Sequence, residues 1–247
     1  MYLSPMLAKE FEQQGLSLFR WRSYWPLVAL ALAVLIVWLR PNPYPALAWP
    51  ALALGLLGLL IRIATVGYTP KNTSGRNTAE GQVAESINTQ GMYSLVRHPL
   101  YLGNFLMWLA PALLTGHGWF ILVFILAFWL YYERIMFAEE QFLFGKFGSE
   151  YQNWAQSRPA FLPRALTWHR PGLSFSWKKV LKKEKNGLAA LLLVMAGIRH
   201  VERCSELGLW VLPEADFWNL AALISTLLYV VLKLIKKYSS WLDEAGR

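Results

Sequence analysis

Residues Trp119–Phe137 read WFILVFILAFWLYYERIMF, with no charged residue before Glu133. A membrane-spanning helix needs about 20 mostly apolar residues, so this stretch predicts a span. Across the chain of 247 residues, 55% are hydrophobic and only 16% are charged, whereas soluble domains carry about 25% charged residues. The apolar residues also come in long blocks, unlike the narrow stripes of amphipathic helices. We therefore predict an all-α integral membrane protein.

The remaining apolar blocks set the number of spans. Trp119–Phe137 is the fourth of six candidates, and the other five, in chain order, are Tyr24–Leu39, Tyr44–Val66, Pro99–Thr115, about Gly187–Ile198, and Phe217–Ile235. The first and third are short, and the fifth is the weakest. We expect about six transmembrane helices, some short, with a cytoplasmic helical segment after the fourth. The last two blocks could instead form a re-entrant hairpin.

The positive residues give an independent check on this count. With six spans, 21 of the 24 Lys and Arg residues fall on one side of the membrane. Because Lys and Arg accumulate in cytoplasmic loops, we expect both termini to be cytoplasmic, in the cell (inner) membrane. Topology and anionic lipid headgroups also account for the net charge of +9, so no nucleic-acid partner is expected. The long polar lead before the first span favours a retained helix over a cleaved signal peptide.

The basic stretch Leu173–Lys185 contains five lysines between apolar residues. It is either a helix lying along an anionic leaflet or an ordinary positive-inside loop. Cys204 is the only cysteine, so neither an internal disulfide nor a cysteine metal cluster can form.

The stretch from Gly91 to Asn104 reads GMYSLVRHPLYLGN. Pro99 can occupy the first turn of a helix, and the residue before a proline disfavours helical geometry, which places His98 at the boundary. Arg97 and His98 would then lie at a helix N-terminus, where free N–H groups attract anions. Arginine can bind a carboxylate with two parallel hydrogen bonds. Taken alone, Arg97 would be interpreted as a snorkelling residue at the membrane edge, because Lys and Arg routinely flank spans.

Two further polar features lie within or beyond the spans. Tyr101 and Asn104 share one helical face, and an asparagine in a span is costly unless it meets a partner or a wet cavity. Glu139 and Glu140 follow the fourth span directly. Their directions differ by about 100°, so only one of them can point squarely at a given ligand atom. Taken singly, each glutamate would be interpreted as an ordinary solvent-exposed residue at the end of a helix.

Together these features resemble the isoprenylcysteine carboxyl methyltransferase and phospholipid methyltransferase superfamily. The likeness runs from about Gly91 to Pro163 and rests on an ordered set: Gly91 and Tyr93, the core Arg97-His98-Pro99-x-Tyr101, the pair Glu139-Glu140, and the tail Phe147, Gly148, Tyr151 and Pro163. The resemblance implies S-adenosylmethionine held between helices near the cytoplasmic face. No Gly-x-Gly-x-x-Gly sequence occurs, so a nucleotide-binding Rossmann domain is not expected.

The resemblance also implies roles for particular residues. We expect the cofactor site to contain Tyr93, Arg97, His98, Pro99, Tyr101, Asn104, Glu139 and Glu140, with Arg97, His98 and Glu140 as catalytic groups. We divide the chain into three predicted parts: an N-terminal membrane hairpin (1–68), a methyltransferase core (69–163), and a basic interfacial segment with a C-terminal membrane hairpin (164–247). Two features depart from the family pattern, namely the two apolar blocks after Pro163 and the polar stretch Asn72–Thr78.

The acceptor is less defined than the cofactor. A site beside the bilayer implies a lipid or lipid-modified acceptor with a carboxylate, phosphate or amine headgroup, and no metal. An ionised carboxylate or phosphate needs no base, whereas an amine must first lose a proton, for which His98 or a glutamate is placed. Arg76 and Asn77 are candidates for headgroup binding, although such polar loops are more often plain connectors. A multi-span transporter and a catalytically silent lipid-binding protein are the alternative functions.

Overall fold

The computed structural model describes residues 4–71, 73, 76–78, 81–244 and 246. Its helices are α1 (Pro5–Trp21), α2 (Trp25–Leu39), α3 (Ala48–Tyr68), α4 (Pro99–Leu114), α5 (Gly118–Phe147), α6 (Ser149–Ser157), α7 (Trp177–Leu207) and α8 (Phe217–Tyr238). Two 3-10 turns, Pro45–Leu47 and Gly91–Ser94, precede α3 and α4, and a short antiparallel ribbon joins β1 (Arg76–Thr78) to β2 (Gly81–Val83). The predicted all-α membrane class is confirmed, because helices make up nearly all of the regular structure.

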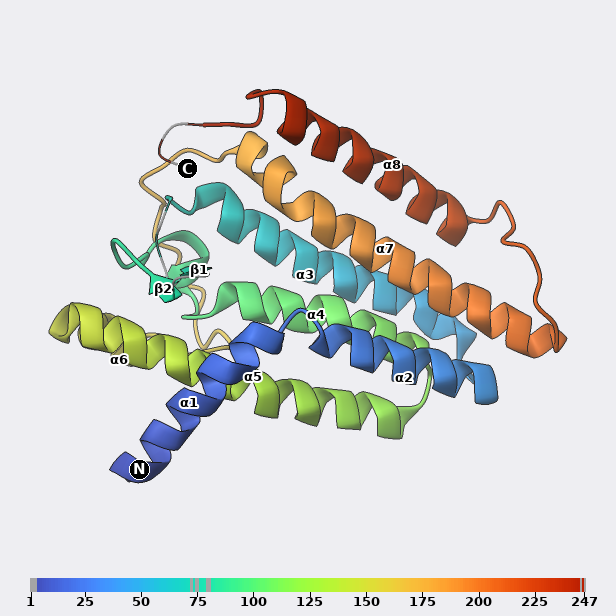
Figure 1. Ribbon diagram of the computed structural model, residues 1–247, viewed down its shortest axis with the longest axis horizontal. Helices are drawn as coiled ribbons and strands as arrows, with labels where there is room; N and C mark the ends of the chain where they lie inside the picture. The colour runs from blue at the N-terminus through green and yellow to red at the C-terminus, as the bar shows by residue number, and fades with distance from the viewer. Residues whose placement is uncertain (1–3, 72, 74–75, 79–80, 245, 247) are drawn as a thin grey trace.

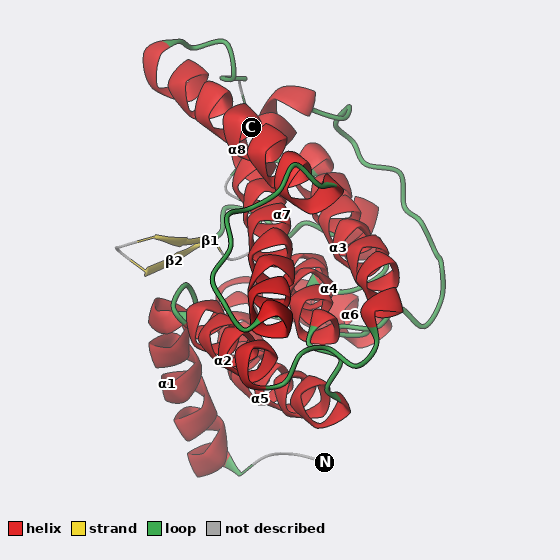
Figure 2. Cartoon of the chain, turned by 90° about the vertical axis from the view of Figure 1, so that its right-hand side faces the viewer, coloured by secondary structure: helices red, strands yellow, loops and turns green. Residues whose placement is uncertain are grey.

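The long helices form one bundle. Figure 1 shows α3, α4, α7 and α8 side by side, and the most extensive packing is between α3 and α4 and between α7 and α8. Helix α2 packs on α7, and α1 packs on α5. Viewed from the side in Figure 2, the bundle is several helices thick, and α7 lies inside it. Met195 and Ile198 of α7 are accordingly fully buried.

The six predicted apolar blocks all lie in helices of the bundle. Three helical stretches of the described chain are individually long and apolar enough to cross a membrane: Pro45–Tyr68, Gly118–Phe147 and Phe217–Tyr238. Helix α2 reaches that length only together with α1, from which it is bent by 66°, and α4 is a shorter apolar helix. The chain is thus a multi-pass membrane protein.

One local expectation needs correction, and one helix was not predicted. The lysine-rich stretch is neither a loop nor a separate surface helix, because residues from Trp177 onward run without a break into the predicted fifth span as α7. The polar N-terminal lead is also helical. Ser4 caps α1 by accepting a hydrogen bond from the Leu7 amide, and Pro5 stands in the first turn, which is a recognisable start signal.

Helices α3 and α4 approach closely through two glycines. A Cβ added at Gly58 would lie 2.6 Å from the Gly103 carbonyl oxygen and 2.8 Å from the Met107 amide nitrogen. Small residues at such crossings let membrane helices pack backbone to backbone. This close approach brings the end of α3 beside the start of α4, where the candidate site lies.

We expect Gly58→Ala to destabilise the protein by about 1–3 kcal/mol, because backbone atoms of α4 cannot move aside without separating the helices. Gly197→Ala in α7 is the matched control, since a Cβ there meets nothing within 4 Å. Thermal unfolding in detergent should show a lower midpoint for Gly58→Ala only. Equal midpoints for the two variants would contradict the close crossing.

Candidate active site

The turn before α4 is fixed by backbone hydrogen bonds from a distant part of the chain. The amides of Arg97 and His98 donate to the carbonyls of Pro159 and Ala160 at 2.9 and 3.0 Å. His98 has non-helical backbone angles, and α4 begins at Pro99, as the proline pattern predicts. The two side chains before α4 are therefore held in place by the segment that follows α6.

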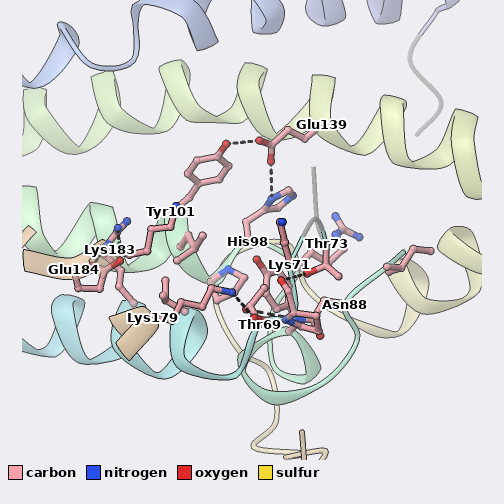
Figure 3. A pocket seen from close by; sticks show the side chains of 18 of the residues that line it. Thr69, Lys71, Thr73, Asn88, His98, Tyr101, Glu139, Lys179, Lys183 and Glu184 are labelled. Carbon is pink, nitrogen blue, oxygen red and sulfur yellow. Dashed lines mark hydrogen bonds and ion pairs between the residues drawn. The ribbon is translucent and has the colours of Figure 1, made fainter. Parts of the chain in front are cut away.

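The imidazole of His98 lies between the two glutamates of α5. Its Nε2 is 2.8 Å from Glu140 Oε1, and its Nδ1 is 3.7 Å from Glu139 Oε2. Tyr101 donates its hydroxyl proton to Glu139 Oε1 at 2.6 Å. As predicted, the two glutamates point in different directions. Each lies beside a different nitrogen of the His98 ring. Figure 3 shows Tyr101, Glu139 and His98 connected in this way.

Arg97 connects three segments at the same place. Its Nε lies 2.9 Å from Glu140 Oε1 in an ion pair whose N–H is not aligned for a hydrogen bond. Its Nη1 donates to the Ala155 carbonyl at the end of α6 at 2.9 Å. This mixture of contacts does not fit a snorkelling side chain, whose guanidinium would point into water.

These residues open onto a cavity of about 950 Å³ at one end of the bundle. Ligand pockets are commonly about 300–1,000 Å³, so this one could hold two small ligands or one large one. Figure 3 shows side chains from well-separated segments, including Thr69, His98, Glu139 and Lys183, around one space. The end of α1 and the residues after α8 also contribute to the lining.

Most of the predicted cofactor residues line this cavity. They are Tyr93, Arg97, His98, Pro99, Tyr101 and Glu139. Glu140 lies behind His98, and Asn104 is held by Arg62, so among the described residues neither of the two lines the cavity. Arg76 and Asn77 lie in β1, but their side chains lie outside the described residues, so their predicted role in headgroup binding stays a prediction.

Helix α6 adds two aromatic side chains to the lining, Tyr151 and Trp154. The hydroxyl of Tyr151 and the indole N–H of Trp154 are buried, and neither has a hydrogen-bond partner among the described residues. Burial, reinforced by the nearby charge of Glu140, raises the pKa of Tyr151 well above its usual range. Buried donors normally have partners, so these two groups mark a place where a polar ligand would be received.

The sequence motifs did not reveal one polar network, the link between Arg62, Glu184 and Asn104. Arg62 donates from Nε and Nη2 to the two oxygens of Glu184, both at 2.8 Å, and from Nη1 to Asn104 Oδ1 at 2.5 Å. The network joins α3, α7 and α4, and Glu184 is only 4% exposed. The sequence did contain one sign of this network, because Arg62 lies inside the predicted span Tyr44–Val66. A charged residue inside a span usually has a function or a partner.

The central region of the chain matches a known family. The family model for phospholipid methyltransferases matches residues 49–150, which include all but the first residue of α3, the turn before α4, and both glutamates. Within the described chain, no group of three or more His, Cys, Asp or Glu side chains could hold a metal ion.

Several curated proteins are similar to parts of the chain. Methanethiol S-methyltransferase 2 of Bradyrhizobium diazoefficiens is 31% identical over 166 residues, which are 60% of this chain and 62% of that protein. The cobalt-zinc-cadmium resistance protein CzcN of Cupriavidus metallidurans is 37% identical over 115 residues, 46% of this chain and 49% of that protein. The protein-S-isoprenylcysteine O-methyltransferase of Schizosaccharomyces pombe is 33% identical over 75 residues, 30% of this chain and 32% of that protein.

The matched regions span about a third to three fifths of the length of these relatives. No solved structure matches the chain. The fold and the cavity define an all-α, multi-pass membrane protein with a polar site at one end of its bundle. The matches confirm that it resembles the isoprenylcysteine carboxyl methyltransferase and phospholipid methyltransferase superfamily.

We expect Glu184→Gln to lower the stability of the protein by up to about 3 kcal/mol, because it leaves the Arg62 charge without its partner in a largely buried setting. Glu214→Gln is the control, since Glu214 pairs with Arg203 where both side chains are about half exposed. Such surface pairs contribute about 0–1 kcal/mol. Unfolding midpoints in detergent that fall equally for both variants would contradict a structural role for the Arg62 network.

Proposed function

We propose that this protein is a membrane-embedded methyltransferase that uses S-adenosylmethionine to methylate a lipid or lipid-modified acceptor near the cytoplasmic face. One observation carries the proposal. The Arg97-His98-Tyr101 motif and Glu139 line one cavity, and Glu140, 42 residues after His98, contacts His98 and Arg97 beside it. The family match over residues 49–150 and two relatives named as methyltransferases support the same activity.

The residues of the cavity fit the proposed methyl donor. When bound, S-adenosylmethionine supplies a methyl group already activated by its sulfonium centre, so the protein need not generate an electrophile. Arg97 suits the methionine carboxylate, and Glu139 suits the ammonium group or the ribose hydroxyls. The unpaired donors of Tyr151 and Trp154 suit the remaining oxygen and nitrogen acceptors of such a molecule.

Catalysis by this site would come mainly from orientation and from the exclusion of water. His98 is 7% exposed and has a carboxylate beside each ring nitrogen, which holds the imidazole in one orientation. Glu140 acts in this proposal through His98, since it lies against the Nε2 side of the ring. If the acceptor is an amine, His98 is the group placed to take its proton.

The same geometry supports a cytoplasmic site. The N-terminal helix, the 69–91 segment, the end of α5, the start of α7 and the residues after α8 all contribute to this end of the bundle, and Figure 1 shows both termini on that side. These are the segments in which most Lys and Arg residues occur. By the positive-inside rule, both termini then face the cytoplasm of a cell (inner) membrane.

Binding of S-adenosylhomocysteine by the purified protein tests the proposal against its alternatives. A methyltransferase should bind this demethylated product of the cofactor, whereas a transporter without methyl chemistry should not. A catalytically silent member could still bind it, so the second measurement is lipid mass spectrometry of cells with and without the protein. A methyl-sized mass shift in a membrane lipid or lipid-modified molecule is the expected result.

We expect Arg97→Ala to weaken S-adenosylhomocysteine binding strongly, because truncating one partner of a desolvated charge pair costs about 2–5 kcal/mol. Arg97→Lys keeps the charge but loses the planar fork, so weak binding should remain. Arg134→Ala is the control, since Arg134 pairs with Glu133 and is not among the cavity-lining residues. Unchanged affinity in well-folded Arg97→Ala protein would remove Arg97 from the site.

Glu139→Gln and Glu140→Gln should lower the affinity for S-adenosylhomocysteine by different amounts. Glu139 lines the cavity, so its loss should weaken binding directly. Glu140 contacts His98 and Arg97, so its loss should act through their positions and weaken binding less. Isothermal titration of the two variants measures the difference. Negligible loss in both would mean that the pair is only the polar end of α5.

A further inference from the structure

Three of the arginines in the described chain line the cavity, and two of them are matched by carboxylates. Arg62 donates to both oxygens of Glu184. Arg97 lies in an ion pair with Glu140. The third, Arg22, forms no ion pair with a described acidic residue. Because a guanidinium is always charged at neutral pH, Arg22 brings to the cavity a positive charge that no described carboxylate contacts.

The side chain of Arg22 is held in place by the end of α1. Its guanidinium carbon lies 3.6 Å from the centre of the Phe19 ring, an arrangement in which the ring face attracts the cation. Its Nη1 donates to the Phe19 carbonyl at 2.7 Å. This hydrogen bond uses one of the five N–H groups of an arginine. The guanidinium is therefore oriented and keeps donors for a ligand.

Two contacts with Tyr131 of α5 fix the corner between α1 and α2, where Arg22 lies. The Tyr131 hydroxyl donates to the Leu18 carbonyl, just before Arg22, at 2.5 Å. The Trp25 ring, just after Arg22, stacks on the Tyr131 ring with 5.6 Å between the ring centres. The two helices meet at 66°, and Figure 1 shows α1 beside α5 before the bend into α2. Arg22 is thus tied to α5, the helix that carries Glu139.

Arg22 and Glu139 form a pair of opposite charges that do not neutralise each other by direct contact. Both line the cavity, but the Glu139 carboxylate contacts Tyr101 and His98 instead. Burial raises the pKa of the Glu139 carboxyl, and the charge of Arg22 is among the effects that lower it, so the two groups lie within electrostatic reach. An α-amino acid carries its ammonium and its carboxylate on one carbon atom. Such a pair of charges therefore suits an amino-acid group.

We propose that Arg22 binds the carboxylate of the methionine part of S-adenosylmethionine, while Glu139 binds its ammonium group. The proposal rests on the methyltransferase function and adds to it a cofactor-binding residue that precedes the matched region, which begins at residue 49. Arg97 can still donate a hydrogen bond to the same carboxylate. Its charge is already balanced by Glu140, however, so Arg22 supplies the positive charge that the carboxylate requires.

A purely structural role for Arg22 makes a different prediction. Arginines near the end of a helix commonly donate to its last carbonyls, as Arg22 does to that of Phe19. If Arg22 were only such a cap, its loss would loosen the corner and weaken every ligand of the cavity alike. If it binds the cofactor, the loss is confined to ligands that carry the carboxylate. Two ligands that differ in this group therefore separate the two roles.

The test measures binding to the full-length protein in neutral dodecyl maltoside micelles by isothermal titration calorimetry. S-adenosylhomocysteine is the first probe. The second is 5′-deoxy-5′-methylthioadenosine, which keeps the adenosine and the sulfur but lacks the amino-acid group. Arg22→Gln removes the charge and retains an amide donor for the Phe19 carbonyl. It should weaken S-adenosylhomocysteine binding by about tenfold to a hundredfold, as expected for hydrogen bonds to a charged group, and leave methylthioadenosine binding unchanged.

Two further variants complete the comparison. Arg22→Lys keeps the charge but loses the planar fork, so its affinity for S-adenosylhomocysteine should lie between those of the unaltered protein and Arg22→Gln. Arg20→Gln is the matched control, because Arg20 lies at the same end of α1, is exposed, and is not among the cavity-lining residues. It should change the affinity for neither probe.

Four outcomes would overturn the proposal. They are equal losses for both probes in Arg22→Gln, unchanged affinity for both probes in that variant, an equal loss of S-adenosylhomocysteine binding in Arg20→Gln, and equal affinity of the unaltered protein for the two probes. Absence of S-adenosylhomocysteine and methylthioadenosine binding by the unaltered protein would instead contradict the methyltransferase function, so the two failures are distinguishable.

Discussion

The ion pair between Arg62 and Glu184 is the interaction on which the rest of the site depends. Both charges lie on helices that are otherwise packed in an apolar bundle, and charges in such a place need partners. The two hydrogen bonds between them fix the rotation of α3 relative to α7, and Asn104 adds α4 to the same network. Because Gly58 and Gly103 let α3 and α4 approach closely, the arginine can reach both neighbours. All three helices contribute to the lining of the cavity.

The length of α5 supplies the second constraint. Its 30 residues correspond to about 45 Å, which exceeds the apolar thickness of about 30 Å that a bilayer requires. The excess projects the Glu139-Glu140 pair beyond the apolar section, toward the start of α4. There the ring of His98 separates the two carboxylates, which would otherwise repel each other. One uninterrupted helix therefore carries both an apolar span and part of the candidate site.

Several separate segments of the chain line the cavity. Its lining draws on the N-terminal part through Arg22 and Arg62, on the central part through the motif before α4, and on the C-terminal part through α7 and the residues after α8. The family match ends at residue 150, before α7 begins. The cavity is therefore lined both by residues inside the matched region and by residues outside it.

The sequence by itself determined the membrane class, the positions of the apolar helices and most of the cofactor-site candidates. Those features are local: apolar blocks of a given length, a proline that starts a helix, and an ordered motif. The tertiary structure decided that Glu140 lies behind His98 and that Asn104 serves Arg62, because both facts depend on how separate helices rotate against each other. It also decided that Lys179, Lys182 and Lys183 line the cavity. A hydropathy pattern records how apolar a segment is, but the partner of a charge 122 residues away is fixed only when the bundle packs.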